Sequence, residues 1–126
     1  MLLDTAVLLY VTYDAPRLSP VARYTYNDKD AQLFVSVVSI WEIVTKNRLG
    51  KLPLPVSIEA MLRPLKHARS LHILPLTESA VLRLTTLPDV HRDPFDRMLV
   101  CQAIDEGLTF LTPDRQISAY PVPTLW

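Results

Sequence analysis

The chain has 126 residues, of which 49% are hydrophobic, and its 13 basic residues balance 13 acidic ones. This length and composition suit a single folded domain over residues 1–126 and exclude a disordered chain. Because the formal net charge is zero, no overall field attracts nucleic acid, and any binding of RNA or DNA must depend on local groups of charge.

The N-terminal stretch MLLDTAVLLYV lacks the features of a targeting segment. Asp4 interrupts it and no basic residues precede the apolar run, which is not typical of a signal peptide. No apolar run approaches the roughly eighteen residues that a membrane-spanning helix needs. We therefore expect a cytoplasmic protein that does not contact a membrane.

Glycine and cysteine are scarce in the chain, which excludes several kinds of site. Phosphate-binding GxxxxGK loops, dinucleotide-binding GxGxxG turns and GxSxG nucleophile elbows all need closely spaced glycines. Gly50 and Gly107 each follow an amphipathic stretch, which predicts left-handed C-caps of helices. Cys101 is the only cysteine and allows neither an internal disulfide nor a thiolate zinc cluster; its apolar surroundings predict a packing role.

Short apolar runs alternate with longer amphipathic ones along the chain. Strands are expected over 2–3, 33–37, 72–76, 108–112 and 122–125, and helices over 6–13, 17–27, 39–49, 57–70, 78–87 and 95–106. Pro64 should break or kink the 57–70 helix. Alternation of this kind predicts an α/β fold with a central, mostly parallel sheet covered by helices on both faces.

Four acidic residues fall where such a sheet would bring them together. Sites in parallel sheets form beyond the carboxyl ends of the strands. One acid ends the first apolar run, one follows the second strand, one lies near the start of the last helix, and one ends a later strand: Asp4, Glu42, Asp96 and Asp114. These positions are spread over the whole sequence, so their convergence at one edge predicts a shared site.

Each acid also has a local explanation. Ser39 and Glu42 match the capping-box pattern, and Asp114 after Pro113 is typical of a turn or cap. In HRDPFD, Asp93 is expected as the N-cap of the last helix, and Asp96 falls in its first turn, where it complements the helix dipole. Capping alone suits Asp96 poorly, because this residue shares a helix face with apolar residues and an inward carboxylate needs a cation or hydrogen-bond donors.

Six stretches carry a family resemblance and cover nearly the whole chain in order: LLDTAVLLY, LFVSVVSIWEIVTKNRLGKLPLP, ILPLT, HRDPFDRMLVCQA, LTFLTPDRQISAY and VPTLW. Together they resemble PIN-domain ribonucleases, specifically the VapC-type toxins of toxin–antitoxin pairs. The resemblance implies a three-layer α/β/α sandwich, metal-dependent cleavage of RNA and neutralisation by an antitoxin protein.

The resemblance also assigns roles to residues of the predicted site. The acidic quartet of the family falls on Asp4, Glu42, Asp96 and Asp114. We expect Asp4 and Asp96 to bind the metal directly, with Glu42 and Asp114 completing the shell or orienting the attacking water. Clustered carboxylates favour Mg²⁺ or Mn²⁺. The sequence departs from the family at Ala6, where a polar residue is common, and in the few residues before Asp4, which make the first strand very short.

Residues around the quartet receive further expectations. Asp93 would be a capping or auxiliary acid, and the Thr112 hydroxyl would steady the site. Contacts with the RNA backbone are expected from nearby basic residues: Lys46, Arg48, Arg97 and Arg115. The histidines show no zinc-motif spacing and are expected in surface or structural roles: His67, His72 and His91.

Protein partners are expected as well. An amphipathic antitoxin helix would cover apolar surface near Tyr10, Trp41 and Leu49, and the chain is expected to form a homodimer.

Other functions with carboxylates at strand ends fit less well. A haloacid-dehalogenase type needs Asp-x-Asp after the first strand, but Ala6 stands at the second position. A receiver domain needs a lysine after its last core strand, and LTPDR contains none. A catalytically silent PIN-like binding module remains as an alternative, although the intact acidic quartet argues against it. A nuclease acting on DNA also remains, because no residue of the sequence is known to read the 2′-hydroxyl of RNA.

Overall fold

The computed structural model describes residues 1–68 and 71–126, with only the backbone described for residues 66–68. Its strands are β1 (Leu2–Leu3), β2 (Leu33–Ser36), β3 (Leu71–Leu74), β4 (Phe110–Leu111) and β5 (Thr124–Leu125). Its α-helices are α1 (Thr5–Tyr13), α2 (Pro20–Asn27), α3 (Val37–Arg48), α4 (Ile58–Ala68), α5 (Glu78–Arg83) and α6 (Pro94–Asp105). Short 3₁₀ helices follow α1 and β4: η1 (Ala15–Arg17) and η2 (Arg115–Ala119).

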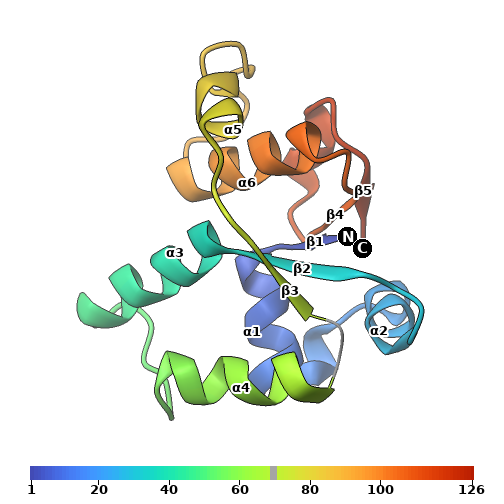
Figure 1. The fold of residues 1–126 in the computed structure, drawn as a ribbon, viewed down its shortest axis with the longest axis vertical. Coiled ribbons are helices and arrows are strands. Elements are labelled where there is room, and N and C mark those ends of the chain that lie inside the picture. The colour runs from blue at the N-terminus through green and yellow to red at the C-terminus, as the bar shows by residue number, and fades with distance from the viewer. Residues whose placement is uncertain (69–70) are drawn as a thin grey trace.

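The five strands form one parallel sheet in the order β3-β2-β1-β4-β5. The two-residue strand β1 lies at its centre, with Leu2 opposite Phe34 on one side and Phe110 on the other. In Figure 1, α5 and α6 lie on one side of the sheet, and α1 and α4 lie on the other. The expected α/β/α sandwich with a parallel sheet is therefore confirmed.

Neighbouring residues of each strand pack into different halves of the core, because side chains alternate across a sheet. Leu2 and Phe110 belong to the half that contains Leu99 and Val100 of α6. The next residues along the two strands, Leu3 and Leu111, pack into the opposite half with residues of α1, α2 and α4: Val7, Leu8, Ala22, Met61 and Leu62. This double burial explains why strands of only two residues are stable at the centre of the sheet.

Helix α3 begins two residues earlier than the sequence predicts. The Ser36 hydroxyl accepts the backbone N–H of Val38 at 2.9 Å and caps the helix directly after β2. Ser39 therefore lies inside the helix and Glu42 in its second turn, which excludes the capping box as the alternative explanation of Glu42. The physical reason is that the same serine ends the strand and caps the helix, with no loop between them.

Pro64 is expected from the sequence to break or kink helix α4; α4 continues through Pro64, so the break is wrong and the kink stays a prediction. Proline removes one helical hydrogen bond, but Met61 and Leu62 bury their side chains against the core and hold the helix in place. The last two residues of the helix expected over 57–70, and the side chain of His67, lie outside the described residues.

Other sequence expectations hold with shifted boundaries. Gly50 and Gly107 have φ angles of +69° and +62° and follow α3 and α6, as left-handed C-caps should. The helix expected over 17–27 begins only at Pro20, because Ser19 caps α2 there, and Arg17 belongs to the preceding η1. Across the described part of the chain, no helix combines the length and the apolar character needed to cross a membrane.

Candidate metal centre

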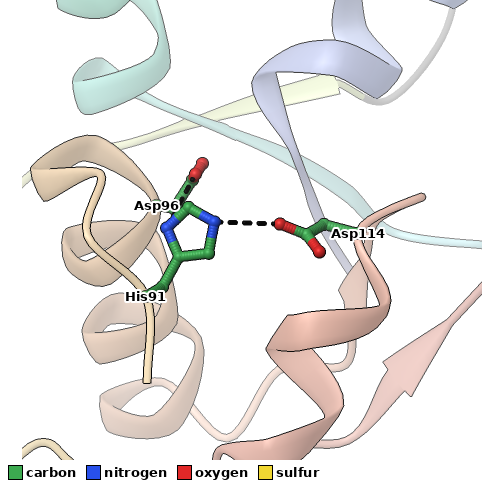
Figure 2. A group of neighbouring side chains, drawn as sticks. All are labelled: His91, Asp96 and Asp114. Carbon is green, nitrogen blue, oxygen red and sulfur yellow. Dashed lines mark ion pairs between the residues drawn. The ribbon is translucent and has the colours of Figure 1, made fainter. Parts of the chain in front are cut away.

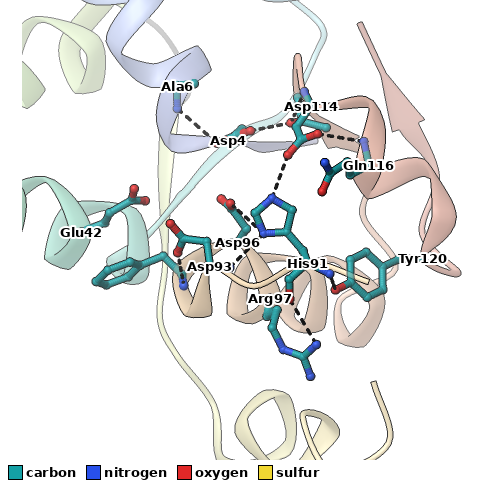
Figure 3. Close-up of polar contacts among 12 residues, drawn as sticks. Asp4, Ala6, Glu42, His91, Asp93, Asp96, Arg97, Asp114, Gln116 and Tyr120 are labelled. Atoms are coloured by element: carbon teal, nitrogen blue, oxygen red, sulfur yellow. Dashed lines mark hydrogen bonds and ion pairs between the residues drawn. The ribbon is translucent and has the colours of Figure 1, made fainter. Parts of the chain in front are cut away.

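The four predicted acids surround one pocket of about 490 Å³ at the carboxyl ends of the strands. Asp4 directly follows β1, Asp114 follows β4, Glu42 lies on the helix that begins where β2 ends, and Asp96 lies in the first turn of α6. Figure 3 shows their side chains converging from these separate elements. The juxtaposition arises because parallel strands end at the same edge of the sheet.

Thr112 links two of these acids through its hydroxyl group. The hydroxyl donates a hydrogen bond to Asp4 Oδ2 and accepts the backbone N–H of Asp114 at 3.1 Å. Asp4 Oδ1 also accepts the backbone N–H of Ala6, at 3.1 Å, so the carboxylate caps α1. Both Asp4 and Thr112 are buried, and the pair fixes the ends of β1 and β4 relative to each other.

Glu42 has a buried carboxylate of which only one oxygen has a partner among the described residues. Its side chain is 6% exposed, and Oε1 pairs with Lys46 one turn further along α3. Among the described residues, the other oxygen, Oε2, has no hydrogen-bond partner. A buried charged oxygen without a partner is costly, and a cation in the pocket would remove that cost.

Asp96 titrates far above the usual range of an aspartate. Its pKa is raised to about 7, mainly by burial and also by the charges of Asp4, Asp93 and Glu42, while the charge of His91 acts in the opposite direction. Burial also raises the pKa of Asp4, against the hydrogen bonds from Thr112 and Ala6. The pocket therefore holds mutually repelling carboxyl groups, which is the electrostatic signature of a site built for a cation.

Asp93 takes the capping role expected for it. Its Oδ1 accepts the backbone N–H of Phe95 at 2.8 Å, and Pro94 occupies the first position of α6. The side chain also lines the pocket, and its Oδ2 lies 4.0 Å from Lys46 Nζ.

His91 lies between two of the site acids, a position that the sequence analysis did not predict. Its Nε2 lies 3.0 Å from Asp114 Oδ2 and its Nδ1 lies 3.3 Å from Asp96 Oδ2, so the ring stands between two of the acids (Figure 2). Of the surface or structural roles expected for the histidines, His91 does not take the surface one, since its side chain is only 16% exposed, whereas His72 is exposed on β3. The available signal was the place of His91, two residues before the Asp93 cap.

The predicted basic residues have different surroundings. Lys46 lines the pocket, and although burial acts to lower its pKa, the hydrogen bond and charge of Glu42 raise the pKa above its usual value. Lys51 also lines the pocket and was not predicted. Arg48 is exposed and outside the pocket lining, and Arg115 lines a neighbouring pocket of about 340 Å³.

Arg97 does not face the acidic pocket. Its guanidinium pairs with Asp89 at 2.9 Å and donates to the carbonyl oxygen of Pro88 at 3.0 Å. Figure 3 shows it pointing away from the His91 ring. Arg97 therefore anchors the loop before α6 and is not part of the pocket lining, and its expected contact with RNA stays a prediction.

The residues present fit a hard divalent cation. The four acids offer carboxylate oxygens, the ligands that Mg²⁺ and Mn²⁺ prefer, and Glu42 Oε2 is buried without a partner in the described structure. A parallel α/β/α sandwich with an acidic pocket at the strand ends defines the protein as a candidate metal-dependent nuclease.

Comparison with known proteins gives the family. The family model described as PIN domain matches residues 1–123, so the chain belongs to the PIN-domain family. It is 28% identical over 131 residues to Ribonuclease VapC22 of Mycobacterium tuberculosis, covering 100% of this chain and 98% of that protein.

Solved structures share the fold at low sequence identity. VapBC2 from Rickettsia felis, bound to a DNA fragment from its promoter, matches with a TM-score of 0.72 and 14% identity over 98% of this chain and 96% of that one. A toxin–antitoxin complex from Klebsiella pneumoniae matches with a TM-score of 0.63 and 14% identity over 99% and 95% of the two chains.

Proposed function

We propose that this protein is a metal-dependent endoribonuclease that acts as the toxin of a toxin–antitoxin pair. The observation that carries the proposal is the pocket in which Asp4, Glu42, Asp96 and Asp114 converge around a buried, unpartnered carboxylate oxygen. Membership of the PIN-domain family and the similarity to a ribonuclease named VapC22 support RNA as the substrate.

The four acids would hold Mg²⁺ or Mn²⁺. When bound, the ion would activate a water molecule and offset the charge of the scissile phosphate. The chain's own part is to fix its ligands: Thr112 holds Asp4, and the start of α6 holds Asp96. Lys46 and Lys51 line the same pocket and supply positive charge beside the RNA backbone.

Cleavage of RNA by the purified protein tests the proposed activity. We expect cleavage with Mg²⁺ or Mn²⁺ and none in EDTA. Asp4→Asn or Asp96→Asn should reduce cleavage at least about 100-fold, because each variant replaces a charged ligand of the ion by a neutral amide. Glu106→Gln is the matched control, since Glu106 is exposed at the far end of α6.

The same assay separates the two alternatives. Activity that survives excess chelator would overturn the metal-dependent mechanism. A protein that binds the ion but cleaves no nucleic acid would be the silent binding module. If single-stranded DNA of the same sequence is cleaved equally well, the substrate is nucleic acid in general and not RNA alone.

The exposed face of α3 is the proposed surface for the antitoxin. Val37, Trp41 and Val44 follow one another at helical spacing and are all exposed, with Trp41 60% exposed and Leu49, just beyond the helix, 63% exposed. Such a stripe fits the apolar face of an amphipathic helix. Tyr10, also expected there, is partly buried and packs beneath the Arg17 guanidinium instead.

Binding of the protein encoded beside this one tests the surface. We expect Trp41→Ser to weaken the complex at least about tenfold, because a large aromatic contact is lost. Tyr24→Ser on α2, where the tyrosine is 78% exposed, should change nothing. Equal affinities of the two variants for the partner would mean that the partner binds another surface of the protein.

The mass of the free protein in solution tests the expected homodimer.

A further inference from the structure

We propose that His91, Asp96 and Asp114 form a mixed nitrogen and oxygen site for a transition-metal ion of the Zn²⁺ class, and that His91 thereby decides which divalent cation the pocket prefers. The proposal concerns cation binding and not RNA cleavage. A protein without ribonuclease activity can still show it, and loss of it leaves the proposed nuclease standing.

The spacing of the three possible ligand atoms approaches that of an occupied metal site. One ligand atom from each of the three residues lies within 4.8 Å of the other two. Ligands bound to one tetrahedral Zn²⁺ at about 2.0–2.2 Å lie roughly 3.4 Å apart. The contact of His91 Nε2 with Asp114 Oδ2, at 3.0 Å, is already near this spacing, and ligand atoms that are up to 4.8 Å apart need to approach each other by up to about 1.4 Å.

His91 is held in this position by its backbone. Its N–H donates to the hydroxyl of the buried Tyr120 at 2.8 Å, and the Arg97 guanidinium donates to the carbonyl oxygens of the loop that leads to it. The imidazole is 16% exposed, well below a surface histidine. A ring fixed between two carboxylates loses little conformational freedom when it binds an ion.

A second feature of the pocket indicates a cation and is independent of these three residues. Glu42 Oε2 lines the same pocket, is buried and has no hydrogen-bond partner in the part of the chain described. The nearby basic side chains are already engaged, Lys46 by Glu42 and Arg97 by Asp89. Among the ion pairs described, Asp96 and Asp114 contact His91 and neither Lys46 nor Arg97.

The proton on the ring shows how an ion would enter. Nδ1 accepts the backbone N–H of Asp93 at 3.1 Å, which places the proton of a neutral ring on Nε2, facing Asp114. A metal bound through Nε2 takes the place of that proton, which moves to Nδ1, and the hydrogen bond from the backbone N–H of Asp93 to Nδ1 is then broken.

Ligand chemistry gives the selectivity. Mg²⁺ binds oxygen and rarely imidazole, whereas Zn²⁺ binds imidazole and carboxylate together. A pocket of carboxylates alone would favour the hard ion. Adding His91 should shift the preference toward Zn²⁺, and a Zn²⁺ ion held there would withdraw Asp96 and Asp114 from the acidic quartet.

Calorimetric titration of untagged protein with Zn²⁺ and separately with Mg²⁺ tests the proposal. We compare the wild type with His91→Gln, and use His72→Gln on the exposed face of β3 as the matched control. We expect His91→Gln to lose at least about tenfold in Zn²⁺ affinity but less than about threefold in Mg²⁺ affinity, and His72→Gln to change neither.

Nitrogen NMR of the wild-type imidazoles keeps the test independent of any variant. On addition of Zn²⁺, one ring nitrogen of His91 should shift to the range of a metal-bound imidazole. An unshifted His91 resonance, an unchanged Zn²⁺ affinity in His91→Gln, or an equal loss of both ions in that variant would each overturn the proposal and leave His91 as a structural partner of two acids.

Discussion

Asp96 occupies a position where local and tertiary environments favour opposite charge states. The first turn of α6 stabilises an ionised carboxylate by about 0.3–1 kcal/mol through the helix dipole. Burial and the neighbouring Asp4, Asp93 and Glu42 disfavour that charge, and they raise the pKa of Asp96 to about 7. Without a cation, the surroundings of the pocket therefore outweigh the helix terminus.

This conflict has a consequence for stability. The pKa of Asp96 is about 7 in the folded protein against an ordinary value of 3.8, so the folded state binds its proton more tightly than the unfolded state. The stability gained from that proton is complete below pH 3.8 and is lost as pH rises toward 7. The free energy of unfolding should therefore fall across this window by up to about 1.4 kcal/mol per pH unit.

Replacement of Asp96 by Asn tests this conflict. In EDTA, we expect Asp96→Asn to show a shallower dependence on pH and to melt higher than the wild type at neutral pH, because the amide keeps the shape and removes the repulsion. Part of the slope should remain, since burial also raises the pKa of Asp4. Urea unfolding at several pH values measures the dependence of the free energy of unfolding on pH, and thermal unfolding in EDTA measures the melting temperature. A variant with the pH dependence of the wild type and a lower melting temperature would make Asp96 a simple capping residue.

At the scale of elements, one buried glutamine fixes the relation of α6 to the sheet. Gln102 Oε1 accepts a hydrogen bond from the Ser36 hydroxyl, which also caps α3, and its amide nitrogen donates to the carbonyl oxygen of Pro75 at 3.0 Å. The contact joins the helix that carries Asp96 to the start of the helix that carries Glu42. The geometry of the acidic pocket thus depends on a polar contact between residues that are not part of the pocket lining.

The alternation of apolar runs was sufficient to predict these elements, but their ends depended on contacts that the sequence does not display. Ser36 and Ser39 both precede apolar helical residues, and only the junction with β2 makes Ser36 the cap. Pro64 carries a local preference against helix, and the burial of Met61 and Leu62 overrides it. Local patterns therefore gave the type and order of the elements, while packing decided their boundaries.

Pro64 should be a removable weakness in α4. It is exposed, so its ring contributes little packing, and it leaves the carbonyl oxygen four residues earlier without a helical donor. We expect Pro64→Ala to raise the free energy of unfolding by about 1–3 kcal/mol, reduced by a gain of about 0.4–1 kcal/mol in unfolded-state freedom. Thermal unfolding measures it, with Arg63→Ala as the matched exposed control. A lower melting temperature of Pro64→Ala would contradict the prediction and mean that Pro64 stabilises α4.

At the scale of the whole molecule, the site is a product of topology. Asp4 and Asp114 are far apart in the chain, yet they meet because β1 and β4 are neighbouring parallel strands, joined further by the Thr112 hydroxyl. Parallel strands place their carboxyl ends together, so the convergence of the acids could be predicted from sequence. The position of His91 could not, because it depends on how Tyr120 and Arg97 hold an irregular loop.

Anomalous diffraction from crystals soaked in Mn²⁺ tests the central claim most directly, since it locates the ion without depending on any choice of RNA. We expect a strong Mn²⁺ peak inside the pocket, bounded by Asp4, Glu42, Asp96 and Asp114, and its loss in crystals of Asp96→Asn. An empty pocket at saturating Mn²⁺, or an ion bound only elsewhere on the protein, would contradict the claim that these four acids form a cation site.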